Sequence, residues 1–240
     1  MTRLDGRSFD ALRPFSIQTD FVSQAGGSVL VSAGRTRVLC NASIDKEVPR
    51  WLKGQGKGWV TAEYALLPRS TNTRVDRERK GVSGRTQEIQ RLVGRSLRAA
   101  TDLFALGERQ IIVDCDVIEA DGGTRTASIT GAFVSLAIAL RKLKEQEDID
   151  KRILTGWLGA VSVGVVDGTP MLDLCYEEDS KAGTDMNVVA LDGDRLVEVQ
   201  GTAEHGAYSR RELDAMLDLA LSGIASLNAV QRSILGDELP

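Results

Sequence analysis

One predicted helix restricts the fold of this chain more than any other segment. The pattern from Thr126 to Leu143 predicts a helix, and between Ala132 and Leu140 it is apolar on almost every face. A helix of this kind is buried on most of its surface, so we expect it to lie against a sheet. The apolar run is about nine residues long, whereas a membrane-spanning helix needs about 20. We therefore expect no membrane association.

Segments of alternating apolar and polar residues accompany this helix in both halves of the chain. In the segment 110–119, one face holds Ile111, Val113, Cys115 and Val117, and Asp114 and Asp116 point to the other, as in a β-strand. A further strand at 59–67 ends before Pro68. Three hairpins are predicted: 29–42 around Gly34, 158–176 around Asp167-Gly168, and 186–202 around Asp192-Gly193, where we expect a two-residue turn.

Two more helices complete the pattern. The first runs from Thr86 to Leu106 with an apolar face that includes Phe104, and the second begins at a capping box formed by Ser209 and Glu212. Strands followed by helices in each half predict an α+β fold, a single compact domain over 1–240 with mixed sheets packed around central helices. Its two similar β-α halves span 10–143 and 155–227, and a charged linker at 144–151 joins them.

The composition is that of a globular protein. The 240 residues are 42% hydrophobic and 27% charged with a formal net charge of −4, which excludes disorder as the main state. The N-terminal residues lack the apolar run of a secretory signal. Since Cys40, Cys115 and Cys175 show no CxxC spacing, we expect reduced, buried thiols and a cytoplasmic protein.

The single histidine limits the chemistry. With only His205, RNA hydrolysis by a pair of histidines and metal sites built from several histidines are both excluded. Any metal ion would be bound by carboxylates, which suit magnesium or manganese better than zinc. We interpret His205 itself as a loop residue, because no hydroxyl or thiol nucleophile motif accompanies it.

Arginine is concentrated in one part of this acidic chain. Between Arg69 and Arg98 nine basic residues stand against three acidic ones, so this window carries +6 and the rest of the chain −10. Eight of the nine are arginines, whose planar side chains form paired hydrogen bonds with phosphate. The window predicts a polyanion site or an oligomer contact, and a solvated charged loop is the alternative.

A glycine pair before the central helix predicts an anion site. In EADGGTRTASITGAF the residues Gly122, Gly123, Thr124 and Arg125 follow a strand and open a helix, where unpaired backbone N–H groups point outward. Thr124 adds a hydroxyl and Arg125 a full positive charge. The segment is not a Walker loop, because it lacks the GK[ST] sequence. An ordinary strand-to-helix turn is the alternative interpretation.

Two further elements could complete such a site. Arg85 stands at the start of the preceding helix, with Ser83 or Thr86 as its N-cap, so two helix starts could converge on one phosphate. Asp179 and Asp185 lie six residues apart and could face a divalent ion from neighbouring strand ends, although a polar hairpin turn also fits. Carboxylates, arginines and a hydroxyl together favour phosphoryl transfer.

These motifs resemble the ribonuclease PH family of phosphate-dependent 3′ exoribonucleases, which process transfer RNA and ribosomal RNA. The likeness covers nearly the whole chain in order, and the segments from Glu119 and from Leu172 are highly specific when they occur together. The matching segments are LPRSTNTRVDRE from Leu67, SGRTQEIQRLVGRSLRA from Ser83, EADGGTRTASITGA from Glu119, LDLCYEEDSKAGTDMNVV from Leu172, and QGTAE from Gln200.

The resemblance implies a role for each of these residues. Inorganic phosphate, as co-substrate, would be bound by Arg85, Gly123, Thr124 and Arg125, and would attack the 3′-terminal phosphodiester of RNA to release a nucleoside diphosphate reversibly. Asp179 and Asp185 would form the catalytic pair and bind magnesium or manganese. The resemblance also implies a homo-hexamer, a trimer of dimers, that trims single-stranded 3′ ends of tRNA precursors. Oligomer contacts and RNA binding would then involve Arg69, Arg74, Arg77 and Arg79.

Two other functions remain as alternatives. A noncatalytic RNA-binding ring subunit of an exosome-like assembly would share the fold, but such relatives lose the phosphate arginines or the aspartates, and this chain has both. A nucleotide-binding phosphotransferase is disfavoured by the missing P-loop lysine. With 11 aromatic residues in total and no evident stacking platform, we expect base identity to matter little.

Overall fold

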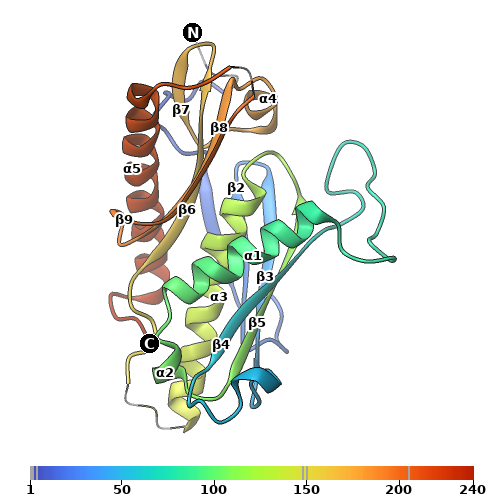
Figure 1. Ribbon diagram of the computed structural model, residues 1–240, viewed down its shortest axis with the longest axis vertical. Helices are drawn as coiled ribbons and strands as arrows, with labels where there is room; N and C mark the ends of the chain where they lie inside the picture. Colours follow the sequence, from blue (N-terminus) through green and yellow to red (C-terminus); the bar gives the residue numbers. More distant parts are fainter. Residues whose placement is uncertain (1–2, 4, 148, 150, 205) are drawn as a thin grey trace.

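Two β-sheets pack against one long central helix, α3 (Thr124–Glu147), in the computed structural model, which describes residues 3, 5–147, 149, 151–204 and 206–240 (Figure 1). The buried helix that the sequence predicted is confirmed, since every residue of α3 from Thr126 to Ala137 is buried. A side chain at Gly27 would overlap the Ser135 carbonyl oxygen at 2.0 Å, so a strand backbone lies directly on this helix. The α+β fold class is confirmed as well.

The first sheet has five strands in the order β1-β2-β3-β5-β4, and only the β4–β5 pair is parallel. Its inner face packs on α3 and on helix α1 (Gly84–Ala99). The predicted alternation at 110–119 is confirmed, because Ile111, Val113, Cys115 and Val117 are buried while Asp114 and Asp116 lie on the other face. The strands are β1 (Phe15–Thr19), β2 (Gly27–Ala33), β3 (Thr36–Asp45), β4 (Trp59–Leu66) and β5 (Gln110–Glu119).

The second sheet has four antiparallel strands in the order β7-β6-β8-β9. The amphipathic helix α5 (Arg210–Leu235) packs on β6, β7 and β8, and its predicted capping box of Ser209 and Glu212 is present. A second core between α5 and the sheet contains Met216, Ala220 and Ile224. The strands are β6 (Leu158–Val166), β7 (Thr169–Leu172), β8 (Thr184–Leu191) and β9 (Arg195–Ala203), and the four-residue helix α4 (Tyr176–Asp179) follows β7.

Several predicted boundaries were wrong for local reasons. The helix predicted to Leu106 ends at Ala99, and a separate helix α2 (Leu103–Leu106) follows, because the segment 100–102 pairs with 153–155 instead. Asp102 then caps α2 through hydrogen bonds from the Phe104 and Ala105 N–H groups, and Phe104 itself is exposed. The predicted linker at 144–151 begins inside α3. The turn after β8 has three residues, 192–194, rather than two.

Two helices have the length and composition of a membrane span, α3 and α5. The core helix of a soluble protein passes the same test, and 83% of the apolar window of α3 is buried inside the protein. For α5 the figure is 33%, since only one face of this helix packs on the second sheet. The expected lack of membrane association stays a prediction.

Candidate active site

A pocket of about 310 Å³ lies where β4, α1 and the start of α3 meet β6, α4 and β8. All six residues predicted to bind phosphate or to form the carboxylate pair line this one pocket: Arg85, Gly123, Thr124, Arg125, Asp179 and Asp185. The first four belong to segments around the first sheet, and the two aspartates belong to segments around the second. The fold therefore brings together groups that are up to 100 positions apart in the sequence.

The glycine pair forms a turn that leaves backbone N–H groups open to the pocket. Gly122 and Gly123 have φ angles of +76° and +63°, which favour glycine. A side chain at Gly122 would lie 2.6 Å from the Leu174 carbonyl oxygen, so the turn sits directly against the segment that leads into α4. Within the described residues the N–H groups of Gly123, Thr124 and Arg125 have no protein acceptor. Such unpaired groups at a helix start suit an anion.

Tyr64 prepares the threonine hydroxyl for the same role. This buried β4 residue, which sequence reasoning missed, donates a hydrogen bond of 2.9 Å from its hydroxyl to Thr124 Oγ1. Burial raises the pKa of Tyr64, so its phenol stays protonated and remains a donor. Because Thr124 accepts from Tyr64, its own hydroxyl hydrogen is free to point at a ligand. Only the alternation of 59–66 could have indicated that Tyr64 faces inward.

The two arginines approach the pocket from different helices. Arg85 is the second residue of α1, where Ser83 caps the helix by accepting from the Thr86 N–H, and its side chain is exposed. Arg125 is the second residue of α3; its side chain is 18% exposed, lies 3.9 Å from Glu88 and has a buried Nε without a protein partner in the described part of the chain. Both guanidinium groups thus retain donors for a ligand.

The two carboxylates come from elements of different kinds. Asp179 ends helix α4 rather than a strand, which corrects the prediction of neighbouring strand ends, and Asp185 lies on β8 opposite Gly164. Burial raises the pKa of Asp179. Burial and the neighbouring Asp179 raise the pKa of Asp185 to about 6, although Arg125 opposes both shifts. Two desolvated carboxylates that repel each other favour a site for a cation.

The raised pKa of Asp185 predicts a pH-dependent loss of stability in the metal-free protein. Between the unfolded value of 3.8 and the folded value of about 6, the folded chain binds more protons, so the free energy of unfolding decreases as pH rises through this interval. Asp185→Asn cannot ionise. In chelator and without phosphate, we expect this variant to have a higher Tm than wild type at neutral pH, and an equal Tm near pH 4.

The control for this measurement is Asp218→Asn, which removes an exposed carboxylate from α5. Its Tm difference from wild type should not change between the two pH values. If the Tm of Asp185→Asn at neutral pH is at or below that of wild type, the ionised Asp185 carboxylate does not destabilise the folded protein, and the assignment is contradicted.

Besides Tyr64, the polar pocket residues Ser162, Asn187 and Tyr176 were not predicted from the sequence. Ser162 on β6 pairs in register with Asn187 on β8, and both line the pocket. The Ser162 hydroxyl is buried and has no partner among the described residues. Tyr176, which is 58% exposed, also lines the pocket, so an aromatic face is available although the sequence suggested no stacking platform. The pairing of β6 with β8, which placed Ser162 here, gives no local sequence signal.

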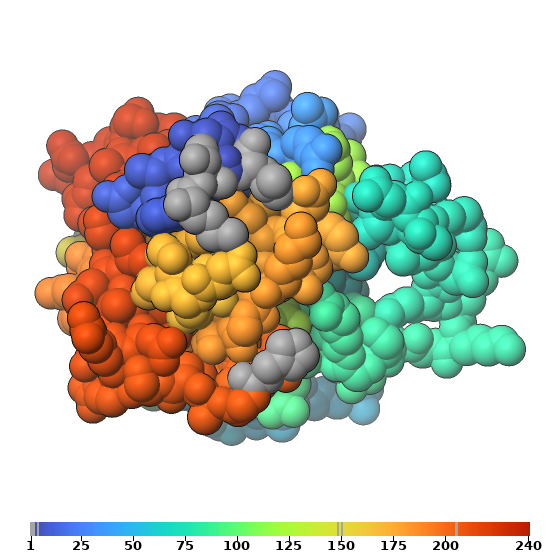
Figure 2. Space-filling view, turned by 90° about the horizontal axis from the view of Figure 1, so that it is seen from above, coloured from blue at the N-terminus to red at the C-terminus, as the bar shows by residue number. Residues whose placement is uncertain are grey.

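The arginines of the predicted RNA or oligomer contact do not line this pocket, although Thr71 of the same loop does. Arg69, Arg74, Arg77 and Arg79 belong to the loop between β4 and α1, which stands out from the body of the molecule (Figures 1 and 2). All four are exposed; Arg69 bonds the Asn72 carbonyl oxygen and Arg74 pairs with Asp76. His205, interpreted as a loop residue, lies outside the described residues.

Comparison with known proteins identifies the family. Residues 11–142 match domain 1 of the 3′ exoribonuclease family RNase PH, and residues 157–223 match domain 2. The chain belongs to the ribonuclease PH family. It is 55% identical over 241 residues to ribonuclease PH of Bacillus subtilis (strain 168), covering 99% of this chain and 98% of the relative. Ribonuclease PH of Bdellovibrio bacteriovorus is 53% identical over 235 residues, covering 98% and 97%.

Solved structures with lower sequence identity share the fold. Rice (Oryza sativa) Rrp46 has a TM-score of 0.78 at 20% identity and covers 97% of this chain and 100% of its own. The Archaeoglobus fulgidus exosome with RNA bound to the active site has a TM-score of 0.79 at 22% identity, covering 95% of this chain and 92% of the matched chain. At this identity these two structures establish the ribonuclease PH fold alone.

Proposed function

We propose that this member of the ribonuclease PH family, a phosphorolytic 3′–5′ exoribonuclease, trims tRNA precursors and releases nucleoside diphosphates. The observation that supports this most strongly is the single pocket in which unpaired N–H groups, two arginines and two carboxylates meet. The N–H groups and arginines suit the binding of a free phosphate ion, and the carboxylates suit the cleavage of a phosphodiester bond.

Each part of the pocket has a task in this reaction. The N–H groups at Gly123 to Arg125, the Thr124 hydroxyl and the two guanidinium groups would bind inorganic phosphate and reduce its repulsion from the scissile phosphodiester. They would also orient one phosphate oxygen in line with the bond that breaks. That oxygen forms the new P–O bond, and the bond to the 3′ oxygen of the shortened RNA breaks. Because a diphosphate replaces a diester, the reaction is reversible.

The carboxylate pair fits a divalent cation. Asp179 and Asp185 offer only oxygen ligands. Burial raises the pKa of both carboxyls, and the neighbouring Asp179 raises that of Asp185 further, so a cation would stabilise their ionised forms. Within the described residues, no three histidine, cysteine or acidic side chains are grouped so that they could hold a metal ion together, so water and RNA would complete the coordination. Bound magnesium or manganese would neutralise charge on the scissile group. Asp179 would either share the cation or protonate the departing 3′ oxygen.

Product analysis in the presence and absence of phosphate tests this function. RNA with a single-stranded 3′ end should yield nucleoside diphosphates when phosphate is supplied, and negligible product when phosphate is omitted. Mass spectrometry distinguishes the outcomes. Monophosphates would mean hydrolysis, and no product in either arm would mean a noncatalytic RNA-binding subunit. Excess nucleoside diphosphate should drive the reverse reaction and lengthen the RNA.

We further propose that the enzyme works as a homo-hexamer in the cytoplasm. The protruding loop at 67–83 supports an oligomer contact or an RNA contact, because its exposed arginines have few partners within the described part of their own chain. Light scattering on wild type and on a variant with Arg74, Arg77 and Arg79 replaced by alanine separates the two roles. Loss of the hexamer assigns the arginines to assembly, and weaker tRNA binding by an intact hexamer assigns them to RNA.

A further inference from the structure

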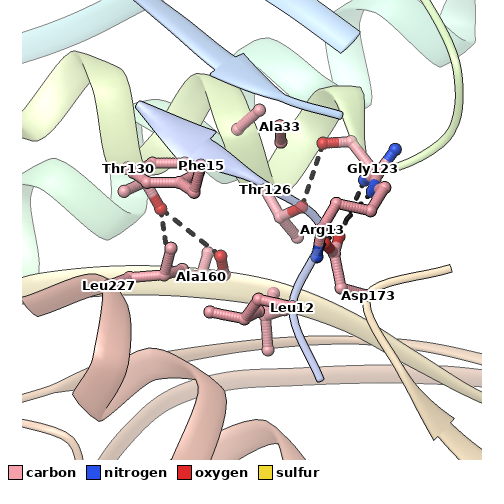
Figure 3. A pocket seen from close by; sticks show the side chains of 12 residues that line it. Leu12, Arg13, Phe15, Ala33, Gly123, Thr126, Thr130, Ala160, Asp173 and Leu227 are labelled. Carbon is pink, nitrogen blue, oxygen red and sulfur yellow. Dashed lines mark hydrogen bonds and ion pairs between the residues drawn. The ribbon is translucent and has the colours of Figure 1, made fainter. Parts of the chain in front are cut away.

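Arg13, which precedes β1, is buried beside the glycine turn of the active-site pocket, and Figure 3, a view of a neighbouring cavity, shows it close to Gly123 and Asp173. Its guanidinium donates from Nη1 to the Asp121 carbonyl oxygen at 2.5 Å and from Nη2 to the Gly122 carbonyl oxygen at 3.4 Å. The other side of the same group donates from Nε and Nη2 to the Asp173 carboxylate, at 3.1 and 2.7 Å. One side chain therefore joins the turn to the segment between β7 and α4.

Asp173 is held in an unusual conformation by this contact. Its φ angle is +54°, a region that residues other than glycine rarely occupy, and its carboxylate also accepts the Arg13 backbone N–H at 2.8 Å. Both side chains are buried, with exposed fractions of 3% for Arg13 and 6% for Asp173. Burial opposes the charge on Arg13, but the Asp173 carboxylate raises the pKa of this guanidinium. The strained backbone of Asp173 and the buried Arg13–Asp173 ion pair are features expected where a protein must hold two segments in a fixed position.

The contacts of Arg13 determine how the peptide groups of the turn are oriented. The carbonyl oxygens of Asp121 and Gly122 accept hydrogen bonds from behind, and Thr36 adds a second one to Gly122 at 2.7 Å. The Gly122 carbonyl and the Gly123 N–H belong to one planar peptide group, so these contacts orient the Gly123 N–H, which has no acceptor among the described residues and lies at the pocket. The Arg13 guanidinium packs directly against Gly123, since a side chain at Gly123 would lie 2.9 Å from Arg13 Nη2.

We propose that Arg13 and Asp173 are positioning residues that fix the phosphate-binding turn relative to the carboxylate segment. Asp173 is six residues before Asp179, and Arg13 attaches it to the turn that opens toward Arg125. The pair therefore sets how the bound phosphate lies relative to the metal-binding side of the pocket. This inference rests on the proposed function, because it concerns the phosphate of that reaction.

Two simpler roles make different predictions. If Arg13 acted through its charge on phosphate, Asp173→Asn would leave the positive charge less compensated and tighten phosphate binding. If the pair only stabilised the fold, substitution would lower Tm and the active fraction, with an unchanged KM for phosphate. Positioning requires that Arg13→Gln and Asp173→Asn both weaken phosphate binding, and that the double variant is no worse than the poorer single variant.

The experiment measures KM for phosphate, KM for RNA and kcat for wild type, the two single variants and the double variant. We expect KM for phosphate to rise roughly 10- to 100-fold in each variant, with KM for RNA within about twofold of wild type. Tighter phosphate binding by Asp173→Asn, or an unchanged KM for phosphate in both single variants, would overturn the proposal. Arg13→Lys keeps the charge but lacks the fork, so it should show the same rise even if Arg13→Gln fails to fold.

A binding measurement separates this inference from the proposed function. Inorganic phosphate should raise the Tm of wild type and raise that of the variants less at the same concentration. If phosphate does not stabilise wild type, the proposed function fails. If it stabilises wild type and the variants equally, only the positioning role fails. Arg109→Gln, which breaks an ion pair with Glu147 far from the pocket, is the control and should respond like wild type.

Discussion

An Asp185→Asn enzyme is expected to lose on the order of 10³-fold in kcat while it keeps its fold. The substitution preserves the size of the side chain but removes the negative charge that would bind the cation at the scissile group. The measurement is the rate of nucleoside diphosphate release at saturating phosphate and RNA. Asp218→Asn, on the exposed side of α5, is the control and should keep the wild-type rate.

The same Asp185 variant links activity to stability. It is expected to lose most of its activity at neutral pH and yet to melt at a higher temperature than wild type, since it no longer buries a carboxylate charge next to Asp179. A variant that retains more than about a tenth of the wild-type rate would remove Asp185 from the catalytic pair, because one general acid or metal ligand contributes about 10²-fold or more.

An Arg125→Ala enzyme is expected to lose phosphate-dependent release through weaker phosphate binding. A hydrogen bond to a charged group contributes about 1.5–3 kcal/mol, so KM for phosphate should rise by roughly 10- to 150-fold. Arg125 has a buried Nε without a protein partner in the described residues, which makes a ligand the natural acceptor. The assay varies phosphate at fixed RNA and reports kcat and KM separately.

Two variants sharpen the Arg125 measurement. Arg125→Lys retains the charge without the planar fork and should recover part of the affinity. Arg91→Ala removes an exposed arginine from α1 that does not line the pocket, and it should behave like wild type. If Arg125→Ala binds phosphate as tightly as wild type, the phosphate lies elsewhere.

The main layers of the fold could be predicted because they follow from local patterns. A helix that is apolar on all faces must be covered on all faces, and α3 is covered by strands of both sheets. The alternation in β5 also determined which face of that strand is buried. The break at 100–102 could not be predicted, since it depends on pairing with 153–155, about 50 residues away.

In the candidate site, too, the residues with a local sequence pattern were predicted and those that depend on distant contacts were missed. Gly123, Thr124 and Arg125 were found because a glycine pair before a helix has a local signature. Tyr64, Ser162 and Arg13 were missed because their importance depends on contacts across the fold: Tyr64 reaches Thr124, and Arg13 reaches Asp173 across 160 positions. Hydrogen-bond partners this distant leave no pattern in a single sequence.

Part of the phosphate site is made of the main-chain N–H groups of Gly123, Thr124 and Arg125, and this has a consequence for how such an enzyme can change over time. Most amino-acid replacements leave an amide group in place, so this part of the site tolerates changes that would destroy a site built from side chains alone. The glycine pair is the exception: both residues have positive φ, and a side chain at Gly122 would collide with the Leu174 carbonyl oxygen. A lineage can therefore lose phosphate binding through a single added methyl group there, without altering any charged residue.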